Sequence, residues 1–317
     1  LTIAPEMVNA ERGVVLAEER ARAGPMLEAS MAMLKLQLGD HPYGRAPIGL
    51  RKTIETVTPE TIRGFYDAYY RPERAILLIV GDINAQTLIP QISEQFSDWK
   101  GRGQPGGDPK PVMVKPPSPD VAMLVTAGAP DTAVTLRWFE PYQERAPTKA
   151  EVRKNLIEQL GAGIVARRMQ GINEAAGKPA AFIGSASPSA ITHVWNGEMA
   201  SSGRVTDVAK TIDVMVKAHR QAVEFGVTQE ELDRQISLRL DASKREAERG
   251  RTGTSVSLVE TALDYIDADV PFVSLQQSYA LLLEQVPTIT LAEVNAALKA
   301  RFTDKPMLTY RGSEAPK

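Results

Sequence analysis

The chain contains no cysteine in 317 residues, and histidine is almost as scarce. Without cysteine there are no disulfides, no thiolate catalysis and no cysteine-bound zinc or iron–sulfur cluster. The three histidines are His41, His193 and His219, and no two of them have the spacing of metal ligands on one helix. These residues alone therefore do not predict a complete zinc site.

Long apolar runs and an excess of charge of one sign are also missing. No apolar stretch approaches the ~18 residues that a membrane-spanning helix needs, and no signal-peptide pattern begins at Leu1. The net charge of −2 gives no broad attraction to nucleic acid or anionic lipid. We therefore expect no nucleic acid and no membrane as a partner.

One pattern occurs twice in the sequence, once near each end. Residues 58–82 and 288–312 each read as a capped amphipathic helix, a turn and an apolar strand. A period this long indicates a duplicated domain rather than a solenoid. The first copy ends at Asp82, too early for a whole unit to precede it, and Leu1 is not an initiator methionine. We therefore expect the chain to start inside a domain.

The expected boundary between the two domains is a segment dominated by Gly, Pro and Lys. Residues 101–119 have the composition of an extended linker. This predicts the C-terminal part of a truncated domain at residues 1–100 and a complete second domain of the same fold at residues 120–317. Strands in neighbouring pairs and helices in runs predict the α+β class, with each domain an antiparallel-rich sheet carrying helices on one face.

Periodicity and capping residues place the individual elements. The pattern 7–38 is helical, with an interruption at Gly24-Pro25 that should kink or split it. Thr58 and Pro59 begin another helix as N-cap and first residue. The other expected helices are 85–99, 148–175, 204–225, 228–250, 255–268 and 290–302, and the expected strands are 75–80, 121–127, 132–140, 180–187, 191–201 and 306–311.

The segment ERGVVLAEE at residues 11–19 is the strongest candidate for chemistry. Glu11, Val14, Val15 and Glu18 follow helical spacing, so they should share one face. A carboxylate on an apolar stripe is costly unless it meets a metal, a cation or hydrogen-bond donors. One interpretation makes Glu18 a metal ligand and Glu11 an outer-shell or proton-handling carboxylate. The alternative is that both flank the stripe and reach solvent.

The histidines allow simpler interpretations. His41 lies in the tight loop HPYG and is either a substrate-contact residue or a turn residue bonded to the backbone. His193 stands in an expected strand beside Trp195, and His219 stands inside an expected helix. Neither has a partner nearby in sequence, so both are interpreted as packing or surface residues.

Four stretches together resemble the pitrilysin/insulinase family of inverted-motif zinc metallopeptidases. They are ERGVVLAEE (11–19), GDHPYGRAPIG (39–49), TPETIRGFYDAYYRPERAILLIVGDI (58–83) and NLIEQLGAGIVARRMQGINEAAGKPAAFIGSAS (155–187). The family is built from repeated α+β units of the metallopeptidase/mitochondrial processing peptidase-like fold. The duplication described above is similar to that plan.

The resemblance implies a zinc-dependent metalloendopeptidase that hydrolyses peptides or small unfolded proteins. In this family a His-x-x-Glu-His motif supplies two zinc ligands and the general base, and a glutamate farther along the chain is the third ligand. On this match Glu18 is the metal ligand, and Glu11 is a catalytic carboxylate that assists the site. No His-x-x-Glu-His occurs here. The fragment is therefore expected to be inactive, with zinc bound tightly only in the full-length protein.

The same resemblance suggests the surroundings of the protein. It implies a peptide substrate, a second homologous half on the same or another chain, and export to the periplasm. A core face left open in the truncated domain would favour a homodimer. An alternative function is a non-catalytic binding or scaffold subunit of the same fold. The presence of both Glu11 and Glu18 favours the catalytic hypothesis.

Overall fold

The computed structural model describes residues 2–39, 44–107, 121–129, 131–141, 148–175, 181–189, 194–203, 207–250, 254–267 and 270–316. They form two compact units. The first comprises Leu1–Ala23, Arg45–Lys110 and Gly253–Asp267, and the second comprises Gly24–Gly44, Pro111–Thr252 and Ala268–Lys317. The domain bounds expected at 1–100, 101–119 and 120–317 stay a prediction.

The second unit is built on a five-stranded sheet of order β1-β5-β2-β4-β3. The edge strand β1 runs parallel to β5, and all other neighbours are antiparallel. This is the antiparallel-rich α+β architecture expected from the sequence. The bounds are β1 Val121–Val125, β2 Thr132–Pro141, β3 Ala181–Ser189, β4 Val194–Gly203 and β5 Met307–Gly312.

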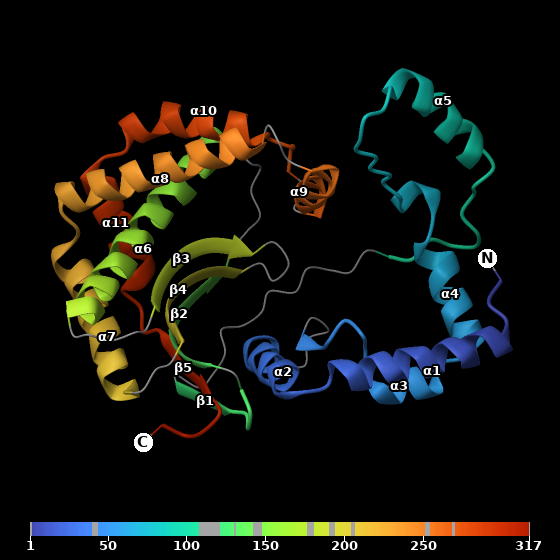
Figure 1. Cartoon of the computed structure of the whole chain (residues 1–317), viewed down its shortest axis with the longest axis horizontal. Helices are drawn as coiled ribbons and strands as arrows, with labels where there is room; N and C mark the ends of the chain where they lie inside the picture. The colour runs from blue at the N-terminus through green and yellow to red at the C-terminus, as the bar shows by residue number, and fades with distance from the viewer. Residues whose placement is uncertain are drawn as a thin grey trace. The chain divides into compact units, whose positions relative to one another are not determined.

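Five helices lie on one side of this sheet (Figure 1). They are α6 Lys149–Ala175, α7 Val208–Phe225, α8 Gln229–Arg249, α10 Leu275–Gln285 and α11 Leu291–Phe302. Helix α6 packs on β3 and β4, α7 packs on β2, and α11 packs on α6 and α7. The core between helices and sheet includes Leu136 and Trp138 of β2, Met199 of β4 and Met169 of α6. Burial of this apolar surface is the main stabilising contribution to the unit.

Helix α2, Pro25–Leu38, belongs to the second unit and approaches the sheet from the opposite face. It packs on β1, and Arg137 of β2 contacts the Met33 sulfur at 4.0 Å. Successive strand residues point to opposite faces, and Leu136 and Trp138 face the five helices. Arg137 therefore points away from them. The expected break at Gly24-Pro25 is confirmed, because α1 (Pro5–Arg22) and α2 are separate helices.

The described part of the first unit consists of helices and connecting segments. Its elements are α1, α3 Arg51–Thr56, α4 Pro59–Tyr69, the 3₁₀ turn η2 Pro72–Arg74, α5 Ala85–Phe96 and α9 Ser255–Asp267. The side chain of Thr58 caps α4 by accepting from the Thr61 backbone N–H at 3.3 Å. Thr290 caps α11 in the same way, accepting from Glu293 N–H at 3.3 Å. The helical half of the repeat is therefore confirmed in both copies.

The prediction of a strand at residues 75–80 is wrong, because the structure has no strand there. The segment has no ladder partner among the described residues, and Ile76, Leu77 and Ile79 are 68, 57 and 43% exposed. A strand requires a neighbouring strand to pair its backbone groups. The corresponding segment of the second copy, β5, has two such neighbours, β1 and β2. The sheet expected in the first domain is thus not formed by its described residues.

Candidate functional site

The segment ERGVVLAEE lies on α1, and two of its charged residues attach α1 to α3. The guanidinium of Arg12 donates to the backbone oxygen of Val57 at 2.8 Å and also to that of Ile54. Glu19 forms an ion pair with Arg51, the first residue of α3. These contacts give Arg12 and Glu19 structural roles. The sequence alone did not distinguish these two residues from the neighbouring Glu11 and Glu18.

The two candidate site residues make fewer contacts. Glu11 and Glu18 lie two turns apart on α1, and both are exposed. Glu18 is paired with Arg22 of its own helix at 2.5 Å, and its side chain is 47% exposed. Glu11 has no hydrogen bond or ion pair to any residue that the structure describes. Neither carboxylate is held by another element of the described structure, and their predicted roles stay predictions.

An apolar pocket of about 590 Å³ opens beside Glu11 in the first unit. The face of α1 that lines it carries Met7, Val8, Glu11 and Val15. The remaining walls come from the N-terminal residues, α3 and α4, and include Thr2, Ile3, Arg12, Ile54, Val57, Ile62, Phe65, Tyr66 and Tyr70. Glu11 is the one carboxylate among these residues, so its charge lies at an apolar surface.

Only part of the expected face of α1 is covered in the described structure. Val15 lines the pocket, but Val14 is 59% exposed. Of the expected face, the pocket therefore takes Glu11 and Val15, whereas Val14, one turn from Glu11 on the same side of the helix, is left uncovered by the described residues. The described part of the first unit lacks a sheet, and within it only one side of α1 is covered by other helices.

No complete metal site occurs among the described residues. Within those ranges, no group of three His, Asp or Glu side chains is placed to hold a metal ion. His41 and His193 lie outside the described residues. In the same part of the chain, no helix is long and apolar enough to cross a membrane. The described residues thus offer zinc at most single carboxylates such as Glu18, an acceptable ligand type that needs further partners.

His219 is a packing residue, as the sequence suggested. Its Nε2 lies 2.7 Å from the backbone oxygen of Phe302, and its ring lies 4.8 Å from the ring of Trp138. Burial lowers the pKa of His219, and the hydrogen bond to Phe302 opposes that shift. The imidazole joins α7 to the end of α11 and has no second polar partner for catalysis among the described residues.

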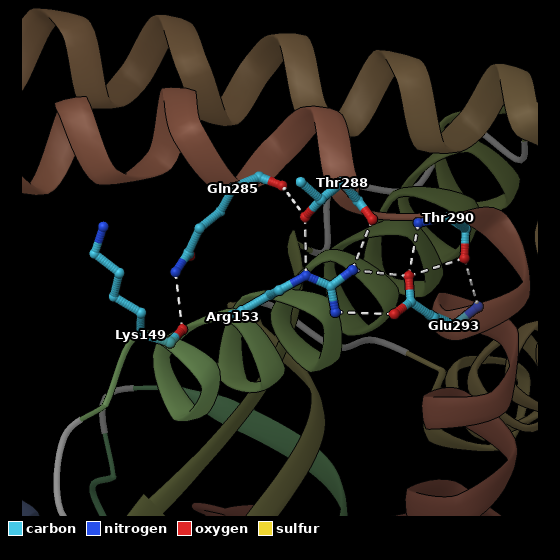
Figure 2. A network of polar contacts seen from close by, with 6 residues as sticks. All are labelled: Lys149, Arg153, Gln285, Thr288, Thr290 and Glu293. Carbon is cyan, nitrogen blue, oxygen red and sulfur yellow. Dashed lines mark hydrogen bonds and ion pairs between the residues drawn. The ribbon is translucent and has the colours of Figure 1, made fainter.

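A larger polar network in the second unit is also structural (Figure 2). Arg153 of α6 donates to both carboxylate oxygens of Glu293 at 2.9 Å. It also donates to the side chain and the backbone oxygen of Thr288 at 2.9 and 2.7 Å. The Arg153 hydrogen bond and those from Thr290 lower the pKa of Glu293 to about 2. With its donors and acceptors used within the fold, this network holds α6 against the start of α11.

Comparison with known proteins connects this geometry to a family. Residues 56–238 match the family model described as the peptidase M16 inactive domain. A 91-residue stretch is 36% identical to a probable zinc protease, PqqL, of Escherichia coli. Over 314 residues, 93% of the chain, it is 24% identical to an uncharacterized zinc protease of Mycobacterium bovis. The crystal structure of the first half of the periplasmic protease PqqL from Escherichia coli superimposes on 99% of the chain with a TM-score of 0.84.

These matches cover different shares of the relatives. The aligned parts amount to 10% of the Escherichia coli protein and 65% of the Mycobacterium bovis protein, so the chain spans less than two thirds of either. It covers 67% of the crystallised half of PqqL at 19% identity, a likeness that shows the fold. The family model, in contrast, matches more than half of this chain. The chain therefore belongs to the peptidase M16 family, of which its sequence resembles the pitrilysin and insulinase members.

Proposed function

We propose that this chain is part of a zinc-dependent metalloendopeptidase that hydrolyses peptides or small unfolded proteins. In this proposal Glu18 is the third zinc ligand and Glu11 is a carboxylate that assists the site. The two histidine ligands and the general base come from a His-x-x-Glu-His segment outside residues 1–317. The chain by itself is then inactive.

One observation carries the proposal: the charged residues of ERGVVLAEE divide into two pairs. Arg12 and Glu19 are used to hold α3. Glu11 and Glu18 have no partner in another element of the described structure. The Glu11 carboxylate also lies beside an apolar pocket, where an unpaired charge is unfavourable. A site that needs carboxylates accounts for both. The curated relatives named as zinc proteases support the same chemistry.

The contribution of this chain to the reaction follows from the positions of its carboxylates. A zinc ion bound by two imidazoles and a carboxylate supplies a Lewis acid that activates water near neutral pH. Glu18, near the C-terminal end of α1, offers an exposed oxygen ligand for that ion. Glu11, about 10 Å farther toward the N-terminus of α1, offers a proton acceptor at the edge of the apolar pocket. The attachment of α3 by Arg12 fixes the helix that carries both.

The direct test is zinc content in a protein that carries both this chain and the His-x-x-Glu-His segment. Glu18→Gln should abolish zinc retained after dialysis, measured by atomic absorption, and with it the hydrolysis of an unfolded test protein. Glu11→Gln should keep the zinc and lower the hydrolysis. The matched control is Glu19→Gln, the neighbouring position, which should lose only the pair with Arg51 and keep its zinc. Full zinc occupancy in Glu18→Gln would disprove the assignment.

The second candidate function is a non-catalytic binding or scaffold subunit. The match to a family model described as inactive favours it. In that case the longer protein would retain no zinc and would not hydrolyse the test protein, yet would still bind unfolded peptide. The same measurements therefore separate the two functions. The partners proposed in either case are a peptide and a second homologous half. The proposed compartment is the periplasm, which is that of the Escherichia coli protease PqqL.

A further inference from the structure

Residues 101–107, whose sequence is GRGQPGG, lie against the end of α4 in the first unit. The side chain of Arg71 reaches them from the turn after α4, and this residue is only 8% exposed. Its Nη1 donates to the backbone oxygen of Arg102 at 2.7 Å and to that of Gly103 at 3.3 Å. The same nitrogen donates to the Asp67 backbone oxygen at 3.1 Å. One buried guanidinium thus joins α4 to the segment.

A second arginine holds the far end of the segment. Arg74 donates to the backbone oxygen of Gly106 at 2.6 Å. The Gly106 N–H in turn donates to the Ala68 backbone oxygen in α4 at 2.9 Å. The Arg74 guanidinium also lies 5.6 Å from the centre of the Tyr69 ring, within cation–π range. Hydrogen bonds from charged donors are stronger than neutral ones, so two such anchors can order a short segment.

Two glycines of this segment are required because a larger residue would not fit at their positions. A Cβ at position 106 would lie 2.5 Å from Cζ of the Tyr69 ring, and a Cβ at position 101 would overlap the Arg71 guanidinium. A Cβ at position 107 would meet no atom within 4 Å. Glycine at 101 and 106 therefore allows close approach to α4. The high glycine content of this segment, which predicts a flexible linker, is here explained by close packing against α4.

We propose that residues 101–107 are a strap, clamped onto α4 by Arg71 and Arg74, and not the first part of a free linker. The connection that leads from this point to the second unit then starts after residue 107 rather than at residue 101. An extended chain spans at most ~3.3–3.6 Å per residue, so clamping these seven residues removes about 25 Å of reach. The YYRPER turn at residues 69–74 thereby shortens this connection between the units. The proposal is independent of zinc.

Trypsin tests the strap directly, because cleavage after Arg102 requires its carbonyl group, which Arg71 occupies. In the native chain, the bond after Arg102 should be cut slowly, and Arg71→Gln should speed its cleavage at least tenfold. Arg74→Gln, which removes the exposed anchor, should give a smaller increase. The rates are followed by mass spectrometry of fragments ending at Arg102. The control is Arg63→Gln on α4, whose pair with Asp67 at 3.9 Å does not involve the strap.

A pair of glycine variants keeps the test decisive if Arg71→Gln fails to fold. Gly106→Ala should release the strap and speed cleavage after Arg102, whereas Gly107→Ala should leave the rate unchanged. Circular dichroism confirms that each variant retains its helices. The proposal is overturned if the Arg102 bond is cut equally fast in the native chain and in Gly106→Ala, or if Gly107→Ala accelerates cleavage as much as Gly106→Ala does.

Discussion

Several arginines of this protein share one task, which is to join segments far apart in the sequence. Arg12 binds carbonyl groups of α3, Arg71 binds those of the strap, and Arg153 binds Glu293 and Thr288. Arg301 of α11 similarly reaches the carboxylate of Glu158 in α6 at 2.9 Å. The planar guanidinium carries five donors and stays charged, so one side chain can satisfy several acceptors at once. These contacts explain why many charged residues of the chain are half-buried.

The Arg153–Glu293 pair makes stability depend on pH. Glu293→Gln should lower the free energy of unfolding at pH 7 by a fraction of 1 kcal/mol, because exposed ion pairs contribute about 0.2–1 kcal/mol and the Glu293 side chain is 41% exposed. The folded pKa of about 2 lies below the ordinary 4.5. This stabilisation is therefore complete above pH 4.5 and is lost as the pH falls toward 2.

Urea unfolding of both proteins at pH 7 and pH 3 measures this effect. The difference between native chain and variant should shrink at the lower pH. Glu284→Gln serves as the control, because within the described ranges Glu284 makes an exposed pair with Lys149 and no other. An equal difference at the two pH values would contradict the assignment of the Glu293 pKa to the Arg153 contact. The single amide oxygen of Gln can keep the capping bonds of Thr290, but it cannot accept from both Arg153 nitrogens, so the variant removes the charge together with one Arg153 hydrogen bond.

Sequence reasoning placed Glu11 and Glu18 on one helix, but it did not reveal the contacts that their neighbours Arg12 and Glu19 make. Helical spacing correctly put Glu11 and Glu18 on one helix. It could not show that Arg12 and Glu19 contact α3, because α3 is distant along the chain and such contacts leave no local periodicity. The roles of Arg71 and Arg74 were missed for the same reason. The only trace of these contacts in the sequence is the pair of glycines at 101 and 106. In a segment rich in glycine and proline they were interpreted as a sign of flexibility.

At the scale of elements, local patterns were reliable wherever a long element had a cap or a strong period. Helix α6, the break before α2 and the strands of the second unit lie within a few residues of the expected bounds. The short helix α3 and helix α10 were not expected. Strand 75–80 was expected because it is apolar, but the described neighbours offer no ladder. Strand formation depends on partners, which a local pattern does not contain.

The contact between α6 and β3 depends on a glycine. A Cβ at Gly184 of β3 would overlap the backbone oxygen of Ala162 in α6. Gly184→Ala should therefore lower the free energy of unfolding by about 1–3 kcal/mol, the usual cost of overpacking. Gly171→Ala is the matched control in α6, because a Cβ there meets nothing within 4 Å. It should raise stability by about 0.5–1 kcal/mol through helix propensity.

Both variants are compared by urea denaturation monitored through helical circular dichroism. Opposite signs of the two changes are the expected result. A neutral Gly184→Ala would mean that α6 can move away from β3 without cost. That outcome would contradict close packing at this point of the second unit.

At the scale of the whole molecule, the two units differ in how well their apolar residues are covered. The second unit encloses a continuous core between sheet and helices. The first unit exposes large apolar side chains along residues 76–83 and on α4 and α5, including Ile76, Leu77, Ile79, Phe65 and Ile89. Exposed apolar patches promote association. The repeat explains the pattern, because the equivalent residues of the second copy lie within a sheet.

We therefore expect the chain to self-associate through its first unit. The double variant Ile76→Lys/Ile79→Lys should shift the sedimentation-velocity distribution toward monomer at a concentration where the native chain is dimeric. Phe225→Lys is the control, since Phe225 is an exposed aromatic residue of the second unit. A native chain that stays monomeric, or a dimer lost equally in the control, would contradict this expectation.

The position of β5 in the sheet determines when the sheet can form during synthesis of the chain. Strand β1 pairs only with β5 among the described strands, and β5 lies between β1 and β2. Yet β5 is the last of the five strands in the sequence, beginning at Met307, whereas β1 ends at Val125. While a ribosome is still making the helices, β1 has no neighbour and β2 has one bare edge. The centre of this sheet can therefore close only when residues 307–312 have left the exit tunnel, and until then the nascent unit presents an unpaired edge to chaperones.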